Sequence, residues 1–377
     1  MRNVLRKGIP APSVAHSFAS SVRSEGFLCV RSVPQRVTRL LVQRQATPRR
    51  LGPTILSNRH YMSPQITDVS GIHVGHSTNK DSSTGCTVVL APADGMRAAV
   101  HVRGRATGTR ELDALSPRHL VSRIHALLLT GGSAFGLAAA DGAMRWLAQQ
   151  GRGFDVGVGV VPIVPSAVIF DLAFGSMCWP QPDDGYRACQ SAGQSVEEGS
   201  VGAGTGATVG KALGLGSAMK SGVGTWAEAR GEVVVGCLAI VNAFGDVRDG
   251  RGEILAGACS ENGFLDARRY LADGGVPGGS LARGGANTTL VVVATNAQLE
   301  RLELQSVAEM TADALGQRIT PVGTQYDGDV VFAVSAGDVK PATALSVELL
   351  AQEATAMAIE RAVCLAVGTE EIPGLAN

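Results

Sequence analysis

Apolar runs alternate with glycine-rich polar stretches along most of the chain. One apolar run is almost purely β-branched and ends near Thr295, and the polar pair Asn287-Thr288 precedes it. Such a run is typical of a strand that is buried on both faces, so we expect a strand to begin at about Thr289. Other apolar runs predict strands at 84–90, 98–102, 124–130 and 330–334, and the strongest long strand is predicted at 232–241.

Helical spacing of apolar residues occurs in three segments. They cover residues 133–150, 297–316 and about 341–364. Gly151 stands where the first segment needs a C-terminal glycine cap, and Pro341 suits the first turn of the last helix. Small residues on the apolar face of the first helix predict close packing against a sheet. That face consists of Phe135, Ala139, Gly142 and Trp146.

Three further segments show neither period. Residues 155–182 are rich in Val, Ile and Pro, which predicts a strand that breaks into a loop. Residues 199–225 contain closely spaced glycines, which predicts backbone that approaches a ligand or a neighbouring strand closely. Residues 260–286 are polar and aperiodic, so we expect a mobile linker that leads to Asn287.

Composition limits the kinds of partner. The formal net charge is zero, which provides no field to attract nucleic acid or anionic membranes. No apolar run approaches the roughly 18–20 residues of a membrane span. The seven cysteines are widely spread without a C-x-x-C pair, as expected for reduced thiols of an intracellular protein. The sequence contains no metal-binding motif and no complete dinucleotide motif, so we expect neither a metal nor a cofactor.

Residues 1–61 have a different composition, with ten Arg and one Lys against a single acidic residue, Glu25. A basic, serine-containing and acid-poor start is typical of a mitochondrial transit peptide. The alternatives are a disordered basic tail or an upstream extension that is not translated, with Met62 as the start. We expect a mitochondrial location if this segment is translated and a cytoplasmic one otherwise, and we exclude the segment from the fold.

Two polar positions at strand ends carry candidate chemistry. Thr288 could cap its strand, or it could become a new N-terminus whose hydroxyl is a nucleophile and whose amine is the base. Asn242 could donate to a developing oxyanion, or it could form a local side-chain turn. The glycine-rich junction at 131–135 is neither a P-loop nor a nucleophile elbow, because it lacks Gly-Lys-Ser/Thr and has Phe135 at the closing glycine position.

Six stretches of the sequence, in this order, resemble the L-aminopeptidase/D-esterase family, often called the DmpA family of self-processing peptidases. They lie between about residues 65 and 370, nearly the whole globular part. The second reads Leu-Thr-Gly-Gly-Ser-Ala-Phe-Gly-Leu and the fifth begins Asn-Thr-Thr-Leu. The six stretches are 66–76, 129–137, 202–211, 242–246, 287–295 and 327–333.

The resemblance implies a fold and a processing event. The implied fold is α+β, a four-layer αββα sandwich that forms a single domain from two autoproteolytic chains. The implied cut falls between Asn287 and Thr288. It separates a large chain, residues 62–287, from a small chain, residues 288–377, and the two chains stay associated.

The resemblance also implies the activity and the roles of individual residues. Thr288 matches the nucleophile, Asn242 the oxyanion donor, and Asp329 and Asp327 the acidic residues that orient the nucleophile and its amine. The implied enzyme is an aminopeptidase that hydrolyses short peptides, amino-acid amides or esters through an acyl-enzyme on Thr288. A homo-oligomer of cleaved heterodimers is also implied.

The sequence departs from the family pattern at three positions and leaves two other functions open. Gly323 and Asn296 stand where many members have histidine and aspartate, and Arg105 replaces a small residue. One alternative is an acyl transferase like glutamate N-acetyltransferase, which shares the ornithine acetyltransferase-like fold. The other is an uncleaved, non-catalytic binding protein of the same fold.

Overall fold

The computed structural model describes residues 63–278 and 287–376. The basic segment 1–61 and the end of the expected linker, residues 279–286, lie outside these ranges. Within the described ranges, no helix is both long and apolar enough to cross a membrane.

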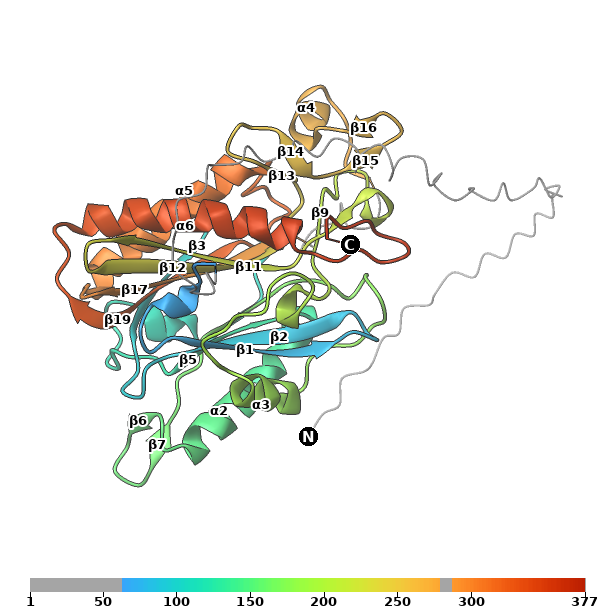
Figure 1. The fold of residues 1–377 in the computed structure, drawn as a ribbon. Helices are drawn as coiled ribbons and strands as arrows, with labels where there is room; N and C mark the ends of the chain where they lie inside the picture. Colours follow the sequence, from blue (N-terminus) through green and yellow to red (C-terminus); the bar gives the residue numbers. More distant parts are fainter. Residues whose placement is uncertain (1–62, 279–286, 377) are drawn as a thin grey trace, which may run out of the picture. The chain divides into compact units, whose positions relative to one another are not determined.

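Two five-stranded mixed sheets lie at the centre of the described part (Figure 1). The first sheet has the order β1-β2-β5-β8-β4 and the second has the order β11-β12-β17-β19-β3. Strands β5 and β8 run parallel, as do β17 and β19, and the other neighbours are antiparallel. The first sheet consists of β1 (His73–Asn79), β2 (Thr84–Leu90), β5 (Ala126–Thr130), β8 (Ser166–Val168) and β4 (Thr109–Arg110). The second consists of β11 (Val223–Arg230), β12 (Val233–Asn242), β17 (Thr288–Ala297), β19 (Val330–Val339) and β3 (Arg97–Val102).

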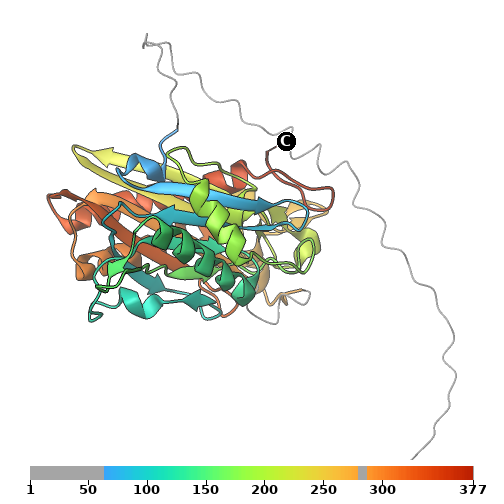
Figure 2. The same ribbon diagram turned by 90° about the horizontal axis from the view of Figure 1, so that it is seen from below.

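Helices cover the outer face of each sheet. Helices α2 (Ala139–Gln149) and α3 (Pro182–Gln190) pack on the first sheet, and Figure 2 shows both lying across its blue strands. Helices α5 (Arg301–Arg318) and α6 (Ala344–Cys364) pack on the second sheet. The layers therefore follow the order helix, sheet, sheet, helix, which confirms the predicted αββα sandwich.

The β-branched run of β17 explains why the second sheet can be buried on both faces. Leu290, Val292 and Ala294 point into the apolar layer between the two sheets. Val291 and Val293 point into the layer beneath α5 and α6. Since side chains alternate between the faces of a strand, a strand that contacts two apolar layers needs an apolar residue at every position.

The predicted helix over 133–150 is divided in two. Residues Ser133–Ala138 form a 3-10 helix, and α2 begins only at Ala139. The tighter turn directs Phe135 outward, so this side chain is 54% exposed and its predicted burial is wrong. Gly142 allows a close approach, but its neighbour is α3 rather than the sheet. A Cβ on Gly142 would lie 1.6 Å from the Pro182 carbonyl oxygen.

The predicted C-terminal cap of α2 is right, and the predicted start of α6 is wrong. Gly151 follows α2 with a φ of +67°, a conformation that favours glycine. Helix α6 begins at Ala344, so Pro341 lies outside it. Thr343 is the N-cap instead, because its Oγ1 accepts a hydrogen bond from the Ser346 amide at 3.2 Å.

Part of the segment expected to be a mobile linker has regular structure. Residues 259–264 form a short hairpin, and α4 (Ala267–Ala272) follows it. The physical reason is Asp246, a buried residue whose carboxylate accepts hydrogen bonds from the amides of Ala258 and Ala267 at 2.9 and 2.7 Å. A contact over this sequence distance leaves no local periodicity, so the linker prediction is wrong here. Its final part, 279–286, lies outside the described residues.

The segment 155–182 breaks into pieces as predicted, with one small hairpin and β8. The remaining elements are short. They comprise η1 (Ile66–Asp68), η2 (Leu112–Leu115), β6 (Phe154–Asp155), β7 (Val160–Val161), η4 (Gly202–Gly204), β9 (Thr208–Val209), η5 (Leu215–Ser217), β10 (Met219–Lys220), β13 (Asp246–Arg248), β14 (Ile254–Ala256), β15 (Cys259–Ser260), β16 (Gly263–Phe264) and β18 (Ile319–Thr320).

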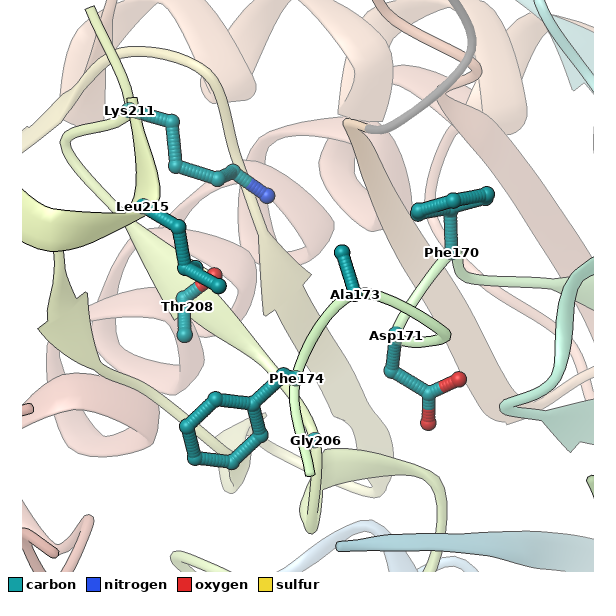
Figure 3. A pocket seen from close by; sticks show the side chains of 8 residues that line it. All are labelled: Phe170, Asp171, Ala173, Phe174, Gly206, Thr208, Lys211 and Leu215. Carbon is teal, nitrogen blue, oxygen red and sulfur yellow. The ribbon is translucent and has the colours of Figure 1, made fainter. Parts of the chain in front are cut away.

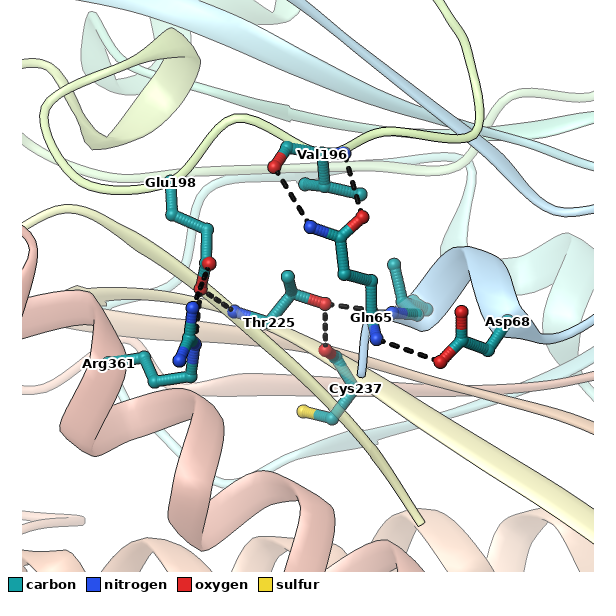
Figure 4. Close-up of polar contacts among 8 residues, drawn as sticks. Gln65, Asp68, Val196, Glu198, Thr225, Cys237 and Arg361 are labelled. Carbon is teal, nitrogen blue, oxygen red and sulfur yellow. Dashed lines mark hydrogen bonds and ion pairs between the residues drawn. The ribbon is translucent and has the colours of Figure 1, made fainter. Parts of the chain in front are cut away.

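Polar contacts connect the start of the described chain with the second sheet and α6 (Figure 4). The Gln65 side chain exchanges hydrogen bonds with the backbone of Val196, at 3.3 and 3.0 Å. Two residues further on, Glu198 accepts a hydrogen bond from the Thr225 amide at 2.9 Å and forms an ion pair with Arg361. This network joins the loop between α3 and η4 to the last helix of the chain.

Candidate active site

Thr288 and Asn242 face each other at one end of the second sheet. Strands β12 and β17 are antiparallel, and the last pair in their register is Asn242 with Thr288. Both side chains are buried. The fold therefore brings together the predicted nucleophile and the predicted oxyanion donor, which lie far apart in the sequence.

The peptide bond between Asn287 and Thr288 is held by short hydrogen bonds. The Asn287 carbonyl oxygen accepts one from the Gly328 amide at 2.7 Å and one from the Thr288 hydroxyl, also at 2.7 Å. Because β17 and β19 are parallel, the acidic turn before β19 lies beside this bond, and Asn287 forms a bridge with Asp327. The Thr288 hydroxyl therefore contacts the carbonyl group of the peptide bond that precedes it.

Both predicted acidic residues lie at this junction. The Asp329 Oδ1 accepts a hydrogen bond from the Thr289 amide at 2.7 Å. Burial, together with the nearby Asp327 carboxylate, raises the pKa of Asp329 to about 7. Asp327 Oδ2 accepts hydrogen bonds from the Thr324 amide and hydroxyl at 2.8 and 2.7 Å, and burial raises the pKa of Asp327 too. Asp329 can therefore exchange a proton near neutral pH.

Several buried polar atoms around the Asn287–Thr288 peptide bond have no hydrogen-bond partner among the described residues. They belong to the residue before β17, to the second residue of β17 and to the acidic turn. They are Asn287 Oδ1, Thr289 Oγ1 and Asp329 Oδ2. Buried polar groups are normally hydrogen-bonded, so a cluster of unsatisfied atoms marks a place that serves something other than stability.

Lys211 belongs to the site, although the sequence analysis did not single it out. It is buried, and its Nζ donates to the Asn242 Oδ1 at 2.8 Å and to the Asn242 carbonyl oxygen at 3.0 Å. Burial lowers the pKa of Lys211 to about 7, and the Asp327 carboxylate opposes this shift. The available signal was a lysine within a largely apolar, glycine-rich stretch.

The Asn242 side chain makes long-range contacts rather than a local turn. Its Oδ1 also accepts a hydrogen bond from the Thr208 amide at 3.1 Å, and its Nδ2 donates to the Phe170 carbonyl oxygen at 3.1 Å. Two donors on Oδ1 fix which end of the carboxamide carries the N–H groups. The closely spaced glycines of 199–225 make this possible, since Lys211 and Thr208 both come from that segment.

A small cavity lies beside this cluster (Figure 3). Its volume of about 10 Å³ is enough for about one water molecule. The residues that hold Asn242 also line the cavity, and Lys211 extends across it in Figure 3. The lining consists of Phe170, Asp171, Ala173, Phe174, Gly206, Thr208, Lys211 and Leu215.

Positions that depart from the family pattern have different surroundings. Asn296 is near the far end of β17, where its Oδ1 accepts a hydrogen bond from the Val234 amide at 2.8 Å, so it is remote from Thr288. At Gly323, a Cβ would lie 2.9 Å from the Arg103 Nε, so this arginine occupies the space of a side chain there. The Arg105 amide donates to the Asp327 carbonyl oxygen at 2.8 Å and so supports the acidic turn.

The geometry combines a buried hydroxyl, hydrogen-bond donors and acids of raised pKa. Such an arrangement suits attack on a carbonyl carbon, with the donors stabilising the negative charge that develops on its oxygen. This chemistry is acyl transfer, to water or to another acceptor.

Comparisons with known proteins agree with this chemistry. The model of peptidase family S58 matches residues 64–374. An uncharacterized aminopeptidase of Mycobacterium bovis is 43% identical over 290 residues, which cover 73% of this chain and 82% of that protein. A 6-aminohexanoate-oligomer endohydrolase of Kocuria sp. is 29% identical over 280 residues, or 72% of this chain and 75% of that protein.

A solved structure shares the fold. The L-aminopeptidase D-Ala-esterase/amidase from Ochrobactrum anthropi, described as a variant of the Ntn hydrolase fold, aligns with a TM-score of 0.61. The alignment covers 82% of this chain and 89% of that chain, at 19% sequence identity.

Proposed function

Because the chain belongs to peptidase family S58, we propose that it is a self-processing aminopeptidase with Thr288 as its nucleophile. The family assignment agrees with the resemblance to the DmpA family. It supports the general activity of a hydrolase. The observation that best supports the finer proposal is the contact of the Thr288 hydroxyl with the Asn287 carbonyl oxygen, which also accepts a hydrogen bond from the Gly328 amide.

The first reaction is the cut of the chain itself. The Thr288 oxygen attacks the Asn287 carbonyl carbon, and the hydroxyl proton passes to a nearby carboxylate, for which Asp329 has a suitable pKa of about 7. The Gly328 N–H stabilises the oxyanion. The C–N bond then breaks, the amine takes up a proton, and an ester between Asn287 and the Thr288 oxygen remains. Water hydrolyses this ester and releases the Thr288 α-amine.

The second reaction uses the new N-terminus. An α-amine has an unperturbed pKa of about 7.7–8.0, so a useful fraction is neutral near pH 7–8 and can accept the hydroxyl proton. Thr288 then attacks a substrate amide or ester while the Asn242 amide stabilises the oxyanion. The leaving amine or alcohol takes the proton, and water hydrolyses the acyl-enzyme. The proposed substrates are short peptides and amino-acid amides or esters.

Two other functions remain testable. An acyl transferase like glutamate N-acetyltransferase would use the same nucleophile but pass the acyl group to an amino acid. An uncleaved binding protein would keep the fold without the reaction. The family assignment favours hydrolysis over both. The name of the Kocuria relative supports testing oligomers of ω-amino acids beside ordinary peptides.

Location and assembly are further proposals. We propose a homo-oligomer of cleaved heterodimers that acts on small peptides without nucleic acid, membrane or cofactor. We propose a mitochondrial location if residues 1–61 are translated, and a cytoplasmic one otherwise.

Intact mass spectrometry with N-terminal sequencing tests the proposal. The wild-type protein should give two chains, of which the smaller begins Thr-Thr-Leu-Val and has about 90 residues, since 377 − 288 + 1 = 90. The Thr288→Ala variant should remain one chain, and Thr289→Ala, at the next buried threonine, should still be cut. The cut protein should release amine from alanine p-nitroanilide, whereas transfer from acetylornithine to glutamate would support the acyl transferase. A folded wild-type protein that stays uncut would refute self-processing.

A further inference from the structure

The orientation of the Asn242 carboxamide depends on two loops of the chain. The loop that follows β8 supplies the Phe170 carbonyl oxygen, and the segment that leads into β9 supplies the Thr208 amide. If either loop moved, the carboxamide would lose a contact that fixes its N–H groups in place. The residues that hold these two loops in place therefore also fix the orientation of the proposed oxyanion donor.

Asp171 anchors the first loop to the first sheet. Its Oδ1 accepts a hydrogen bond from the Gly132 amide at 2.6 Å, and its Oδ2 accepts one from the Thr84 hydroxyl at 2.7 Å. Only 3% of the residue is exposed. Glycine at 131 is needed for this fit, because a Cβ there would lie 2.1 Å from the Asp171 Oδ2. In Figure 3 the Asp171 carboxylate points away from Lys211.

Lys220 anchors the second loop. Its Nζ donates to the carbonyl oxygens of Thr205 and Ala207, at 2.8 Å each, and lies 5.0 Å from the centre of the Phe174 ring. Phe174 belongs to the first loop, where its amide donates to the Asp171 carbonyl oxygen at 2.8 Å, so the lysine contacts both loops. Asp171 and Lys220 are thus two buried charged residues at the same pair of loops.

We propose that Asp171 and Lys220 are positioning residues that hold the Asn242 carboxamide in the orientation needed to donate to the oxyanion. This inference rests on the proposed function. It assigns a role in the reaction to two buried charged residues that do not contact the reacting atoms. Burying charged groups costs free energy, so their presence needs a reason other than core stability. The hydrogen bonds of Asp171 and Lys220, which hold the two loops, provide that reason.

The kinetic test compares Asp171→Ala with Asp171→Asn. The alanine variant removes both anchoring contacts, whereas the carboxamide of the Asp171→Asn variant can still accept from the Gly132 amide and donate to the Thr84 hydroxyl. An oxyanion donor is worth about 10²–10³ in kcat, so partial misplacement should lower kcat by roughly 10–100-fold. KM should stay within about twofold, because the contact acts mainly in the transition state. Asp171→Asn should restore most of the loss.

Asp184→Ala is the matched control. Asp184 also accepts one backbone amide, from Gln181 at 2.8 Å, and one hydroxyl, from Ser77 at 3.0 Å, but it does so in α3 on the outer layer. Its kcat should equal that of the wild-type protein. All rates are expressed per chain that begins with Thr288, as counted by mass spectrometry, so an incomplete cut does not lower them.

Crystal structures of Thr288→Ala and Thr288→Ala/Asp171→Ala provide the second readout, independent of cutting and turnover. The double variant should show the Asn242 carboxamide turned or shifted away from the Phe170 carbonyl oxygen. If Asp171→Ala does not fold, Lys220→Met tests the same loops from the other side, with the same fall in kcat at constant KM. An unmoved Asn242, a loss confined to KM, or an equal loss in Asp184→Ala would overturn the positioning role. An uncut or inactive wild-type protein would instead overturn the proposed function.

Discussion

At position 328 a side chain would collide with the reacting hydroxyl. A Cβ on Gly328 would lie 2.8 Å from the Thr288 Oγ1 and 2.6 Å from the Ala106 carbonyl oxygen, both too close for a carbon atom. The Gly328 amide also donates to the Asn287 carbonyl oxygen. We therefore expect Gly328→Ala to slow the self-cut at least about tenfold, since small misplacements of reacting groups are costly in rate.

A time course of chain masses after expression measures this effect. Gly193→Ala is the control, because a Cβ at Gly193 would meet no atom within 4 Å and its φ is not in the left-handed region. Cutting of Gly328→Ala at the wild-type rate would contradict the proposed geometry of the junction.

Ionisation of Asp329 should lower the free energy of unfolding as the pH rises. The folded-state pKa of about 7 lies above the ordinary value of 3.8, so the folded chain holds a proton that the unfolded chain loses between pH 4 and 7. The stability cost is therefore absent below about pH 4, grows through that window and is complete above pH 7. We expect Asp329→Asn to raise the free energy of unfolding by about 1–3 kcal/mol at pH 8 and by little at pH 4.

Thermal melts at both pH values measure the difference. The comparison uses the Thr288→Ala background, which keeps the chain in one piece. Asp94→Asn, at an exposed carboxylate paired with Arg123, is the control and should change stability little. A difference between Asp329→Asn and its parent that does not depend on pH would be incompatible with a buried, titrating Asp329.

At the level of elements, the sequence predicted those whose pattern is local and regular. The run after Thr288 predicted β17, and its lack of alternation followed from burial on both faces. The predicted start of α6 was wrong. Pro341 is typical of a first helical turn, but Thr343 caps the helix through a short-range hydrogen bond. Short runs and caps compete within a few residues, so periodicity locates elements better than it locates their ends.

The site was predictable only where a motif carries it. Thr288 and Asn242 were singled out by their positions at strand ends, the family resemblance added Asp327 and Asp329, and the structure brings these four together. Lys211 and the positioning residues were missed, because a buried charge is recognised by its partners rather than by its sequence neighbours. Those partners lie in segments that only the folded chain brings near.

The ion pair between Glu198 and Arg361 connects the loop between α3 and η4 to helix α6. Glu198 accepts from the Arg361 Nε at 2.8 Å and from the Thr225 amide at 2.9 Å, and its side chain is only 9% exposed. Removing Arg361 would leave a mostly buried carboxylate without its cation. We expect Arg361→Met to lower the free energy of unfolding by about 2–3 kcal/mol, less than a fully buried pair because the arginine is partly exposed.

Urea unfolding of the Thr288→Ala protein with and without Arg361→Met measures this loss. Arg145→Met, which removes a pair with Asp183 in which both side chains are at least half exposed, is the control and should cost less than about 1 kcal/mol. Equal losses in the two variants would show that the Glu198 pair contributes no more than a surface contact.

Across the whole molecule, the proposed cut separates segments that are interleaved in one sheet. Strands β17 and β19 belong to the small chain, yet they lie between β12 and β3 of the large chain. On one side β12 pairs with β17 from Val235 to Asn242, and on the other β3 pairs with β19. The Arg301 guanidinium of α5 also donates to the carbonyl oxygen of Ser116, in the large chain.

This interleaving makes separation of the two chains unfavourable. Removing β17 and β19 would expose strands that are apolar on both faces and leave β12 and β3 with unpaired edges. We therefore expect the cut protein to elute from a size-exclusion column in one peak that contains both chains, at the volume of uncut Thr288→Ala. The chains should separate only in denaturant, and a small chain that elutes alone under native conditions would contradict this arrangement.

The same topology predicts that the proposed cut follows folding. The junction is formed by Asn242 from β12, the start of β17 and Gly328 before β19, so it exists only when all three strands have paired. A chain kept in urea should stay uncut and should begin to divide only after dilution into buffer. The rate of cutting should then be independent of protein concentration, because the nucleophile and the scissile bond belong to one chain. A rate that rises with concentration would show cutting between chains and would refute the mechanism.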